Sequence, residues 1–280
     1  MLTPKPHPIP SLPRPKPKRL PRKEYVTIAL AFHRPEGIVF GADTRETCTG
    51  YLKRQVPKLV MRPENHQQGM PCAVFAGAGD GSLIDHLIGK LWEGMKHKTD
   101  SIEAMIDAAE DALLNAYGRL AKANHPGELP DQQILIGAWC KPNETALVEV
   151  TNTVLTRNIK SKAIGCGEYL ANYIEDRFWA PKIDLGDLVP VVTYIIDQAR
   201  KHVDGCGGRT HVAVIKANGE MRQLPKHETK RRTERITDID HIARSIAKMA
   251  MDERIDDDVA RQEMMQDVER IMEIRKSMRP

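Results

Sequence analysis

Three residues near the start of the chain have the types and spacing needed for nucleophilic chemistry. Thr27 carries a hydroxyl, Asp43 a carboxylate and Lys58 an ammonium. A hydroxyl is a weak nucleophile until a base takes its proton, and a nearby cation favours the deprotonated form. A carboxylate beside the lysine would keep it charged. The three residues therefore indicate an acyl-transfer site, provided that the fold brings them together.

The elements that would position these residues form a predicted β-hairpin. Val26–Phe32 and Gly37–Asp43 are short runs rich in apolar and β-branched residues, and Pro35 and Glu36 lie between them. The threonine sits at the start of the first strand and the aspartate at the end of the second. The lysine follows a turn-prone segment. All three side chains can then meet at one end of a sheet.

This opening resembles the proteasome-type N-terminal-nucleophile hydrolases, and in particular bacterial proteasome β-subunit-like proteins. The matching residues are Thr27, the GADTR segment at 41–45, and Lys58 before an apolar pair. The resemblance covers roughly residues 26–224. It implies an α+β fold, a four-layer αββα sandwich in which helices flank two stacked antiparallel sheets. The order of predicted strands and helices fits that architecture.

The resemblance also implies roles for the three residues. Thr27 would attack a peptide carbonyl, with its own α-amino group as base once the preceding bond is broken. Asp43 would hold Lys58 charged. The N–H of Gly77 would stabilise the oxyanion, with Gly79 as second choice, and Arg45 would brace the cluster.

Three further positions would support the site in the family, and this chain matches only one of them. Cys166 and Cys206 stand where the family has serines, and Asp204 matches an aspartate. A thiol is a weaker hydrogen-bond partner than a hydroxyl.

The residue before the threonine argues against self-processing. Val26 is β-branched, whereas self-processing relatives have glycine or an initiator methionine there. We therefore keep two alternatives to a threonine-type peptidase acting on polypeptides. One is a catalytically silent scaffold subunit with a docking arm, and the other is an amide hydrolase acting on small molecules.

The remaining elements divide the chain into three parts. We predict a disordered arm or propeptide at 1–24, the αββα domain at 25–225, and a charged helical extension at 226–280. Strands are predicted at 72–77, 131–140, 146–150, 153–156, 211–215 and 221–224, and residues 163–167 are predicted to form a turn that leads into a helix. Helices are predicted at 82–98, 101–120, 169–178, 188–203, 238–249 and 256–272. Ser101 is placed to cap the second of these helices.

The arm carries the basic character of the chain. Residues 1–24 contain eight prolines, seven lysines or arginines and one glutamate, whereas the rest of the chain has a net charge of −2. Prolines remove amide donors and fix φ, so the arm cannot join a sheet or helix. It could be a solvated tail, a removable propeptide, or a docking peptide for an SH3-like or acidic partner.

Composition excludes several function classes. The body is not basic enough to bind nucleic acid, and no run approaches the ~20 apolar residues of a membrane span. The five scattered cysteines have no metal-ligand spacing and predict reduced thiols in a cytoplasmic protein. We expect no cofactor or metal. The resemblance implies self-association into a ring or helical oligomer and possible supply of substrates by an ATP-dependent unfoldase.

Overall fold

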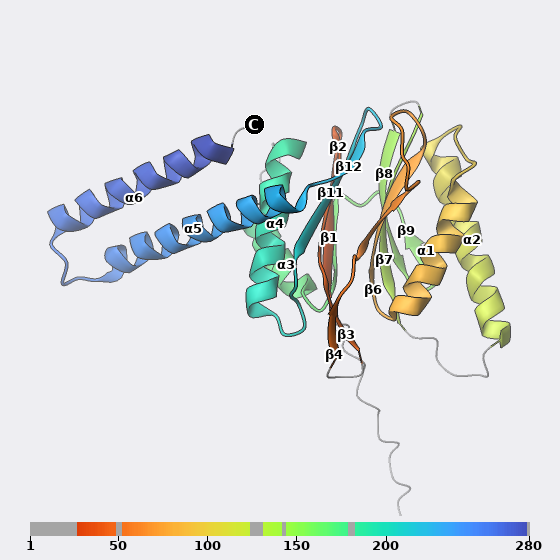
Figure 1. The fold of residues 1–280 in the computed structure, drawn as a ribbon, viewed down its shortest axis with the longest axis horizontal. Helices are drawn as coiled ribbons and strands as arrows, with labels where there is room; N and C mark the ends of the chain where they lie inside the picture. The colour runs from red at the N-terminus through yellow and green to blue at the C-terminus, as the bar shows by residue number, and fades with distance from the viewer. Residues whose placement is uncertain (1–26, 49–51, 124–130, 142–143, 179–182, 279–280) are drawn as a thin grey trace, which may run out of the picture.

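The computed structural model describes residues 27–48, 52–123, 131–141, 144–178 and 183–278. Two five-stranded antiparallel sheets are stacked face to face, and a pair of helices covers the outer face of each (Figure 1). The predicted α+β class and αββα layering, with a C-terminal helical extension, are confirmed. The arm at 1–24 and Val26 lie outside the described residues.

The first sheet contains the predicted hairpin. Its strand order is β10-β1-β2-β11-β12. The bounds are β1 Ile28–Arg34, β2 Gly37–Asp43, β10 Ser161–Gly165, β11 Thr210–Lys216 and β12 Met221–Gln223. The register of β1 with β2 pairs Ala29 with Ala42, which puts the end of β2 beside the start of β1.

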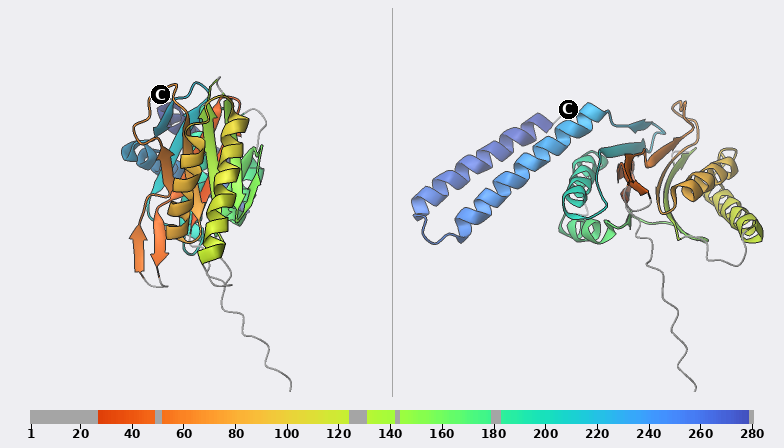
Figure 2. Two further views of the ribbon diagram at one scale, coloured as in Figure 1. Left: turned by 90° about the vertical axis from the view of Figure 1, so that its right-hand side faces the viewer. Right: turned by 60° about the horizontal axis from the view of Figure 1, so that its bottom comes forward.

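The second sheet has the order β5-β6-β7-β8-β9. The bounds are β5 Leu59–Arg62, β6 Cys72–Ala78, β7 Gln133–Cys140, β8 Glu144–Thr151 and β9 Val154–Thr156. A separate hairpin, β3 Arg45–Cys48 with β4 Leu52–Gln55, connects the sheets and extends beyond one end of the sandwich (Figure 2). Strands β3, β4 and β5 were not predicted, and in β3 (RETC) and β4 (LKRQ) no apolar run marks a strand.

Alternation along β1 explains the layering. Ile28, Leu30 and Phe32 face the helices, whereas Ala29 and Ala31 face the second sheet. Both faces are buried, so the strand is continuously apolar in sequence. Small residues on the inner face let the two sheets approach closely.

The helices pack on the sheets through one apolar face each. Helices α1 Gly81–Met95 and α2 Ile102–Ala123 cover the second sheet. Helices α3 Glu168–Phe178 and α4 Leu185–His202 cover the first. Asp80 caps α1 by accepting the Leu83 N–H at 3.1 Å, and the predicted Ser101 cap accepts the Ala104 N–H at 3.1 Å.

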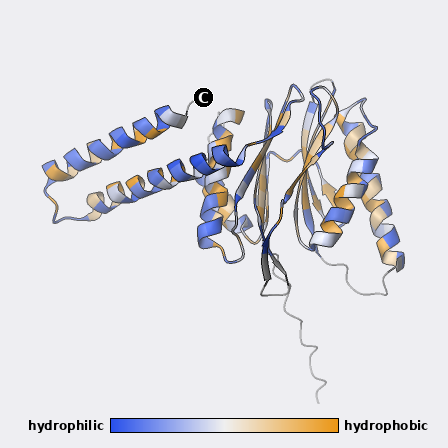
Figure 3. Ribbon diagram, viewed as in Figure 1, coloured by the Kyte–Doolittle hydropathy of each residue, from blue (hydrophilic) through white to orange (hydrophobic). Residues whose placement is uncertain are grey.

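The C-terminal extension is a helical hairpin of α5 Lys226–Met251 and α6 Asp257–Met278, and both helices are largely hydrophilic (Figure 3). Helix α5 begins twelve residues before the predicted start at Asp238. The added turns have little apolar periodicity, so no sequence pattern predicts a helix there. Charged pairs such as Arg232 with Glu228, at 2.9 Å and four residues apart, support the helix instead.

None of the described helices is long and apolar enough to cross a membrane.

Candidate functional site

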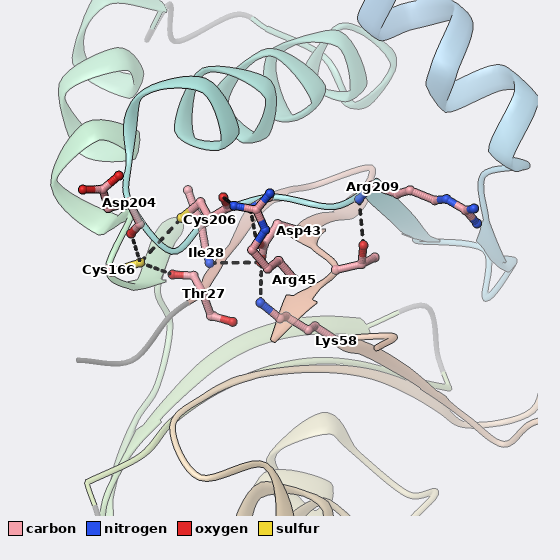
Figure 4. Close-up of polar contacts among 11 residues, drawn as sticks. Thr27, Ile28, Asp43, Arg45, Lys58, Cys166, Asp204, Cys206 and Arg209 are labelled. Atoms are coloured by element: carbon pink, nitrogen blue, oxygen red, sulfur yellow. Dashed lines mark hydrogen bonds and ion pairs between the residues drawn. The ribbon is translucent and has the colours of Figure 1, made fainter. Parts of the chain in front are cut away.

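Asp43 is the centre of a buried polar cluster at one end of the sandwich (Figure 4). Its side chain is fully buried at the end of β2. One carboxylate oxygen accepts the Lys58 ammonium at 2.5 Å and the Ile28 N–H at 3.3 Å. The other accepts the Gly207 N–H at 2.8 Å. The carboxylate thus joins three segments that are far apart in the sequence.

The balance of charge and burial in this cluster favours a tight ion pair. Burial raises the pKa of Asp43 above its ordinary value, and the charge and hydrogen bond of Lys58 oppose that rise. The side chain of Lys58 is itself only 7% exposed. Two buried charges in contact are stable together and unfavourable apart.

Lys58 links the two sheets. It directly precedes β5, and the β5–β6 register pairs Leu59 with Ala76. Continuing that antiparallel register places Lys58 beside Gly77, the predicted oxyanion donor. A Cβ on Gly77 would lie 2.4 Å from the Ile84 side chain, so only glycine fits there. Gly79, with φ of +143°, lies in the turn that leads into α1.

Thr27 lies one residue before β1 and is 5% exposed. Alternation from Ala29 puts its side chain between the sheets, and Figure 4 shows it directed towards the Lys58 ammonium. Its carbonyl accepts the Cys166 thiol at 3.2 Å and the Gly167 N–H at 3.4 Å. The predicted cleavage of the Val26–Thr27 bond concerns a residue outside the described chain.

The three supporting positions reach the cluster in different ways. Cys166, in the turn between β10 and α3, has its sulfur 3.5 Å from that of Cys206. Asp204 contributes its carbonyl oxygen, 3.7 Å from the Cys166 sulfur, while its carboxylate is exposed and points away (Figure 4). The side chain of Asp204 therefore does not join the cluster, because the turn after α4 directs it to solvent.

The two thiols have different acidities. The hydrogen bond with Cys206 lowers the pKa of Cys166 to about 7. The same bond, together with burial, raises the pKa of Cys206. Cys166 is partly exposed and Cys206 is buried. The accessible member of the pair is thus the one that more readily forms a thiolate.

Arg45 braces the loop behind Asp43. Its guanidinium donates to the Cys206 carbonyl at 2.9 Å. A Cβ on Gly207 would lie 2.2 Å from the Arg45 Cζ, so the glycine allows this contact. The Thr44 hydroxyl also accepts the Arg209 N–H at 2.7 Å. No role was assigned to Gly207 or Thr44 from the sequence, although Thr44 lies in the GADTR segment and the GCGG run at 205–208 marks a loop of unusual backbone.

Within the described residues, no group of three or more histidine, cysteine, aspartate or glutamate side chains could hold a metal ion. The cluster is built from the Thr27 hydroxyl, the Asp43 carboxylate, the Lys58 ammonium, two thiols and main-chain groups, and the Thr44 hydroxyl and Arg45 guanidinium hold the loop behind it.

Comparison with known proteins identifies the fold. No protein-family model matches the chain, and a search of curated proteins gave no match. Among solved structures, the chain is similar to an Anbu (Gly-1) mutant from Hyphomicrobium sp. strain MC1, with 17% identity and a TM-score of 0.62 over 82% of this chain and 99% of that one. It is also similar to Anbu (ancestral beta-subunit) from Yersinia bercovieri, with 13% identity and a TM-score of 0.61 over 74% of this chain and 92% of that one.

A third similar structure is described as the helical assembly of the Anbu complex from Pseudomonas aeruginosa, with 16% identity and a TM-score of 0.55 over 71% of this chain and 87% of that one. These matches correct the family inferred from the hairpin. The assignment to the proteasome-type N-terminal-nucleophile hydrolases is wrong, because the structural neighbours are Anbu proteins. At 13–17% identity they show that this chain has an Anbu-like fold.

Proposed function

We propose that this chain hydrolyses amide bonds of polypeptides with Thr27 as the nucleophile, after residues 1–26 have been removed. The observation that carries the proposal is the shared oxygen of Asp43. It accepts the buried Lys58 ammonium at 2.5 Å and the N–H of Ile28, the residue next to Thr27, at 3.3 Å. The start of β1 and the ammonium are thereby tied to one carboxylate.

Removal of residues 1–26 would supply the base. A free α-amino group on Thr27 has a pKa near ~8 and can accept the hydroxyl proton at neutral pH. The Lys58 charge would stabilise the alkoxide as it forms, and the contact with Asp43 would hold that lysine in place. The proton held by the amino group would then pass to the leaving amine, and water would release the acyl group from Thr27.

The Gly77 N–H is the proposed oxyanion donor. The extended β5–β6 register supports this role, because it places Gly77 beside Lys58. A donor of this kind contributes about 3 kcal/mol to stabilising the tetrahedral intermediate.

A catalytically silent scaffold is the second candidate. It is favoured by the burial of Thr27, which is 5% exposed, and by the β-branched Val26 to which its nitrogen is bonded. In an uncleaved chain the threonine has no free amino group, and the Asp43–Lys58 pair would be structural.

We also propose that copies of this chain self-associate. The helical assembly described for the Pseudomonas aeruginosa Anbu complex supports this, as does a row of exposed apolar residues on α6, namely Met265, Val268 and Met272. Analytical ultracentrifugation of the whole chain would test it, and a monomer at all concentrations would contradict it.

The test of catalysis compares the whole chain with a chain that begins at Thr27, released from a cleavable fusion. We expect the Thr27-first chain to hydrolyse fluorogenic peptide amides and unfolded protein. Thr27→Ala should lower the rate by at least about 1,000-fold, as loss of the nucleophile does in other covalent hydrolases. Thr27→Ser should retain activity, because it keeps the hydroxyl.

Thr193→Ala is the matched control. Thr193 is fully buried in α4 and its hydroxyl bonds the Val189 carbonyl, so this variant also loses a buried hydroxyl but not one in the cluster. Lack of turnover by the Thr27-first chain would favour the scaffold. Turnover of acyl amides but not of peptides would instead indicate a small-molecule hydrolase.

A further inference from the structure

Two cysteine sulfurs meet beside Thr27 although they are 40 residues apart in the sequence. Cys166 lies in the turn before α3, and Cys206 lies in the loop between α4 and β11. The sulfurs are 3.5 Å apart. An S–S bond is about 2.0 Å long, so a shift of about 1.5 Å would allow the two to bond.

The pair has the asymmetry of an attacking and a resolving thiol. Cys166 is partly exposed, so a small reagent can reach it, whereas Cys206 is buried. The lowered pKa of Cys166, about 7, makes it the more nucleophilic partner near neutral pH. Cys72 and Cys140 differ, because both are buried and burial raises their pKa values to about 12 and about 11.

We propose that Cys166 and Cys206 form a redox-active dithiol that low-molecular-weight disulfides oxidise to an intramolecular disulfide. The Cys166 thiolate attacks one sulfur of the reagent, forms a mixed disulfide and expels one thiolate. The Cys206 thiol then gives its proton to solvent and attacks the Cys166 sulfur, expelling the second thiolate. One reagent disulfide is reduced to two thiols, and the protein dithiol is oxidised to one disulfide.

The disulfide would act directly on the polar cluster. The Cys166 thiol donates to the Thr27 carbonyl at 3.2 Å, and this hydrogen bond is lost when its proton leaves. Cys206 is bonded to Gly207, whose N–H holds Asp43 at 2.8 Å. A shift of the Cys166 sulfur would therefore act directly on Thr27. A shift of Cys206 would act on Asp43 through Gly207. Any change in hydrolysis rests on the proposed function, whereas the disulfide itself does not.

The experiment incubates the whole reduced chain with oxidised glutathione and follows free thiols, intact mass and tryptic peptides. Each relevant cysteine lies in its own peptide, with Cys166 in 163–177, Cys206 in 202–209 and Cys48 in 46–53. We expect two thiols to be lost, the intact mass to fall by two hydrogens, and 163–177 to be joined to 202–209. A stable glutathione adduct on Cys166, a bond to 46–53, or unreacted thiols would overturn the proposal.

Variants separate the roles of the two thiols. Cys206→Ser should leave the glutathione adduct on Cys166 unresolved, and Cys166→Ser should prevent oxidation at Cys206. The matched control is Cys140→Ala, which removes a buried thiol outside the pair and should form the same cross-link as the wild type. Equal oxidation of Cys206 with and without Cys166 would contradict the assigned order.

The pH dependence of alkylation gives a second readout that does not depend on hydrolysis. A thiolate reacts and a thiol does not, so the rate rises with pH through the pKa. For Cys166 we expect the midpoint of iodoacetamide labelling near pH 7, and Cys206→Ala should move it towards 9.0 because the hydrogen bond is lost. A wild-type midpoint near 9 would contradict the assignment of Cys166 as the attacking thiol.

Discussion

The cluster around Asp43 and the α5–α6 hairpin both use ion pairs, but in opposite surroundings. Asp43 is fully buried, and the side chain of its partner Lys58 is 7% exposed. On α6, Arg261 approaches Asp258 at 3.9 Å, and the two side chains are 76% and 92% exposed. Water screens the second pair and not the first. An ion pair therefore contributes strongly to stability at the end of the sandwich and little on the hairpin.

The two regions also differ in the contacts that hold them in place. The sandwich has three apolar core layers with fully buried side chains. Helix α5 contacts α4 partly through polar bonds, such as Gln198 to Asp240 at 2.5 Å and Lys201 to Thr237 at 3.3 Å. Helix α5 extends away from the sheets, and α6 runs back along it, so that the end of α6 lies near α4 (Figure 1). We therefore expect stability to depend on the first region far more than on the second.

The largest expected effect is that of Lys58→Met. It leaves a buried carboxylate without its cation, which typically destabilises a protein by about 3–5 kcal/mol. Urea unfolding of the whole chain would measure this loss. Arg261→Met on α6 is the matched control, because both members of its ion pair are exposed, and its expected effect is below about 1 kcal/mol. Equal losses of unfolding free energy in the two variants would contradict the difference between the buried and the exposed ion pair.

A smaller effect is expected from Gly207→Ala. The new Cβ would lie 2.2 Å from the Arg45 guanidinium carbon, and overpacking of this kind costs about 1–3 kcal/mol. The extension contains no glycine, so the control is Gly89→Ala on the exposed face of α1, where a Cβ meets nothing within 4 Å. That change should stabilise the chain by about 0.5–1 kcal/mol. An unchanged melting temperature for Gly207→Ala would show that the loop accommodates the new Cβ without loss of stability.

The smallest effect is expected from removing α6, with the chain ending at Asp252. Because α6 packs along α5, the free energy of unfolding of the sandwich should change by less than about 0.5 kcal/mol. Circular dichroism should show the lost helix, and the urea midpoint should stay in place. A drop comparable to that of Lys58→Met would mean that the hairpin is integral to the sandwich.

Contacts in the site could be predicted where the residues lie close together in the sequence and not where they lie far apart. The hairpin fixed the end of β2 beside the start of β1, so the approach of Asp43 to the residue after Thr27 followed from local pattern. The Gly207 contact with Asp43 joins residues 164 positions apart, and no periodicity encodes it. The same holds for the contact of the two sulfurs, because the resemblance placed both cysteines at supporting positions of the site and no spacing predicts that they touch.

The sequence by itself determined the alternating strands, the amphipathic helices of the sandwich and the order that makes them an αββα fold. These features depend on neighbours within one or two turns or a tight hairpin. Tertiary structure decided that Lys58 crosses from the second sheet to Asp43, that Asp204 points to solvent, and that Cys166 meets Cys206. Those outcomes depend on how sheets stack and where loops end, which is set by packing across the whole core and not by local pattern.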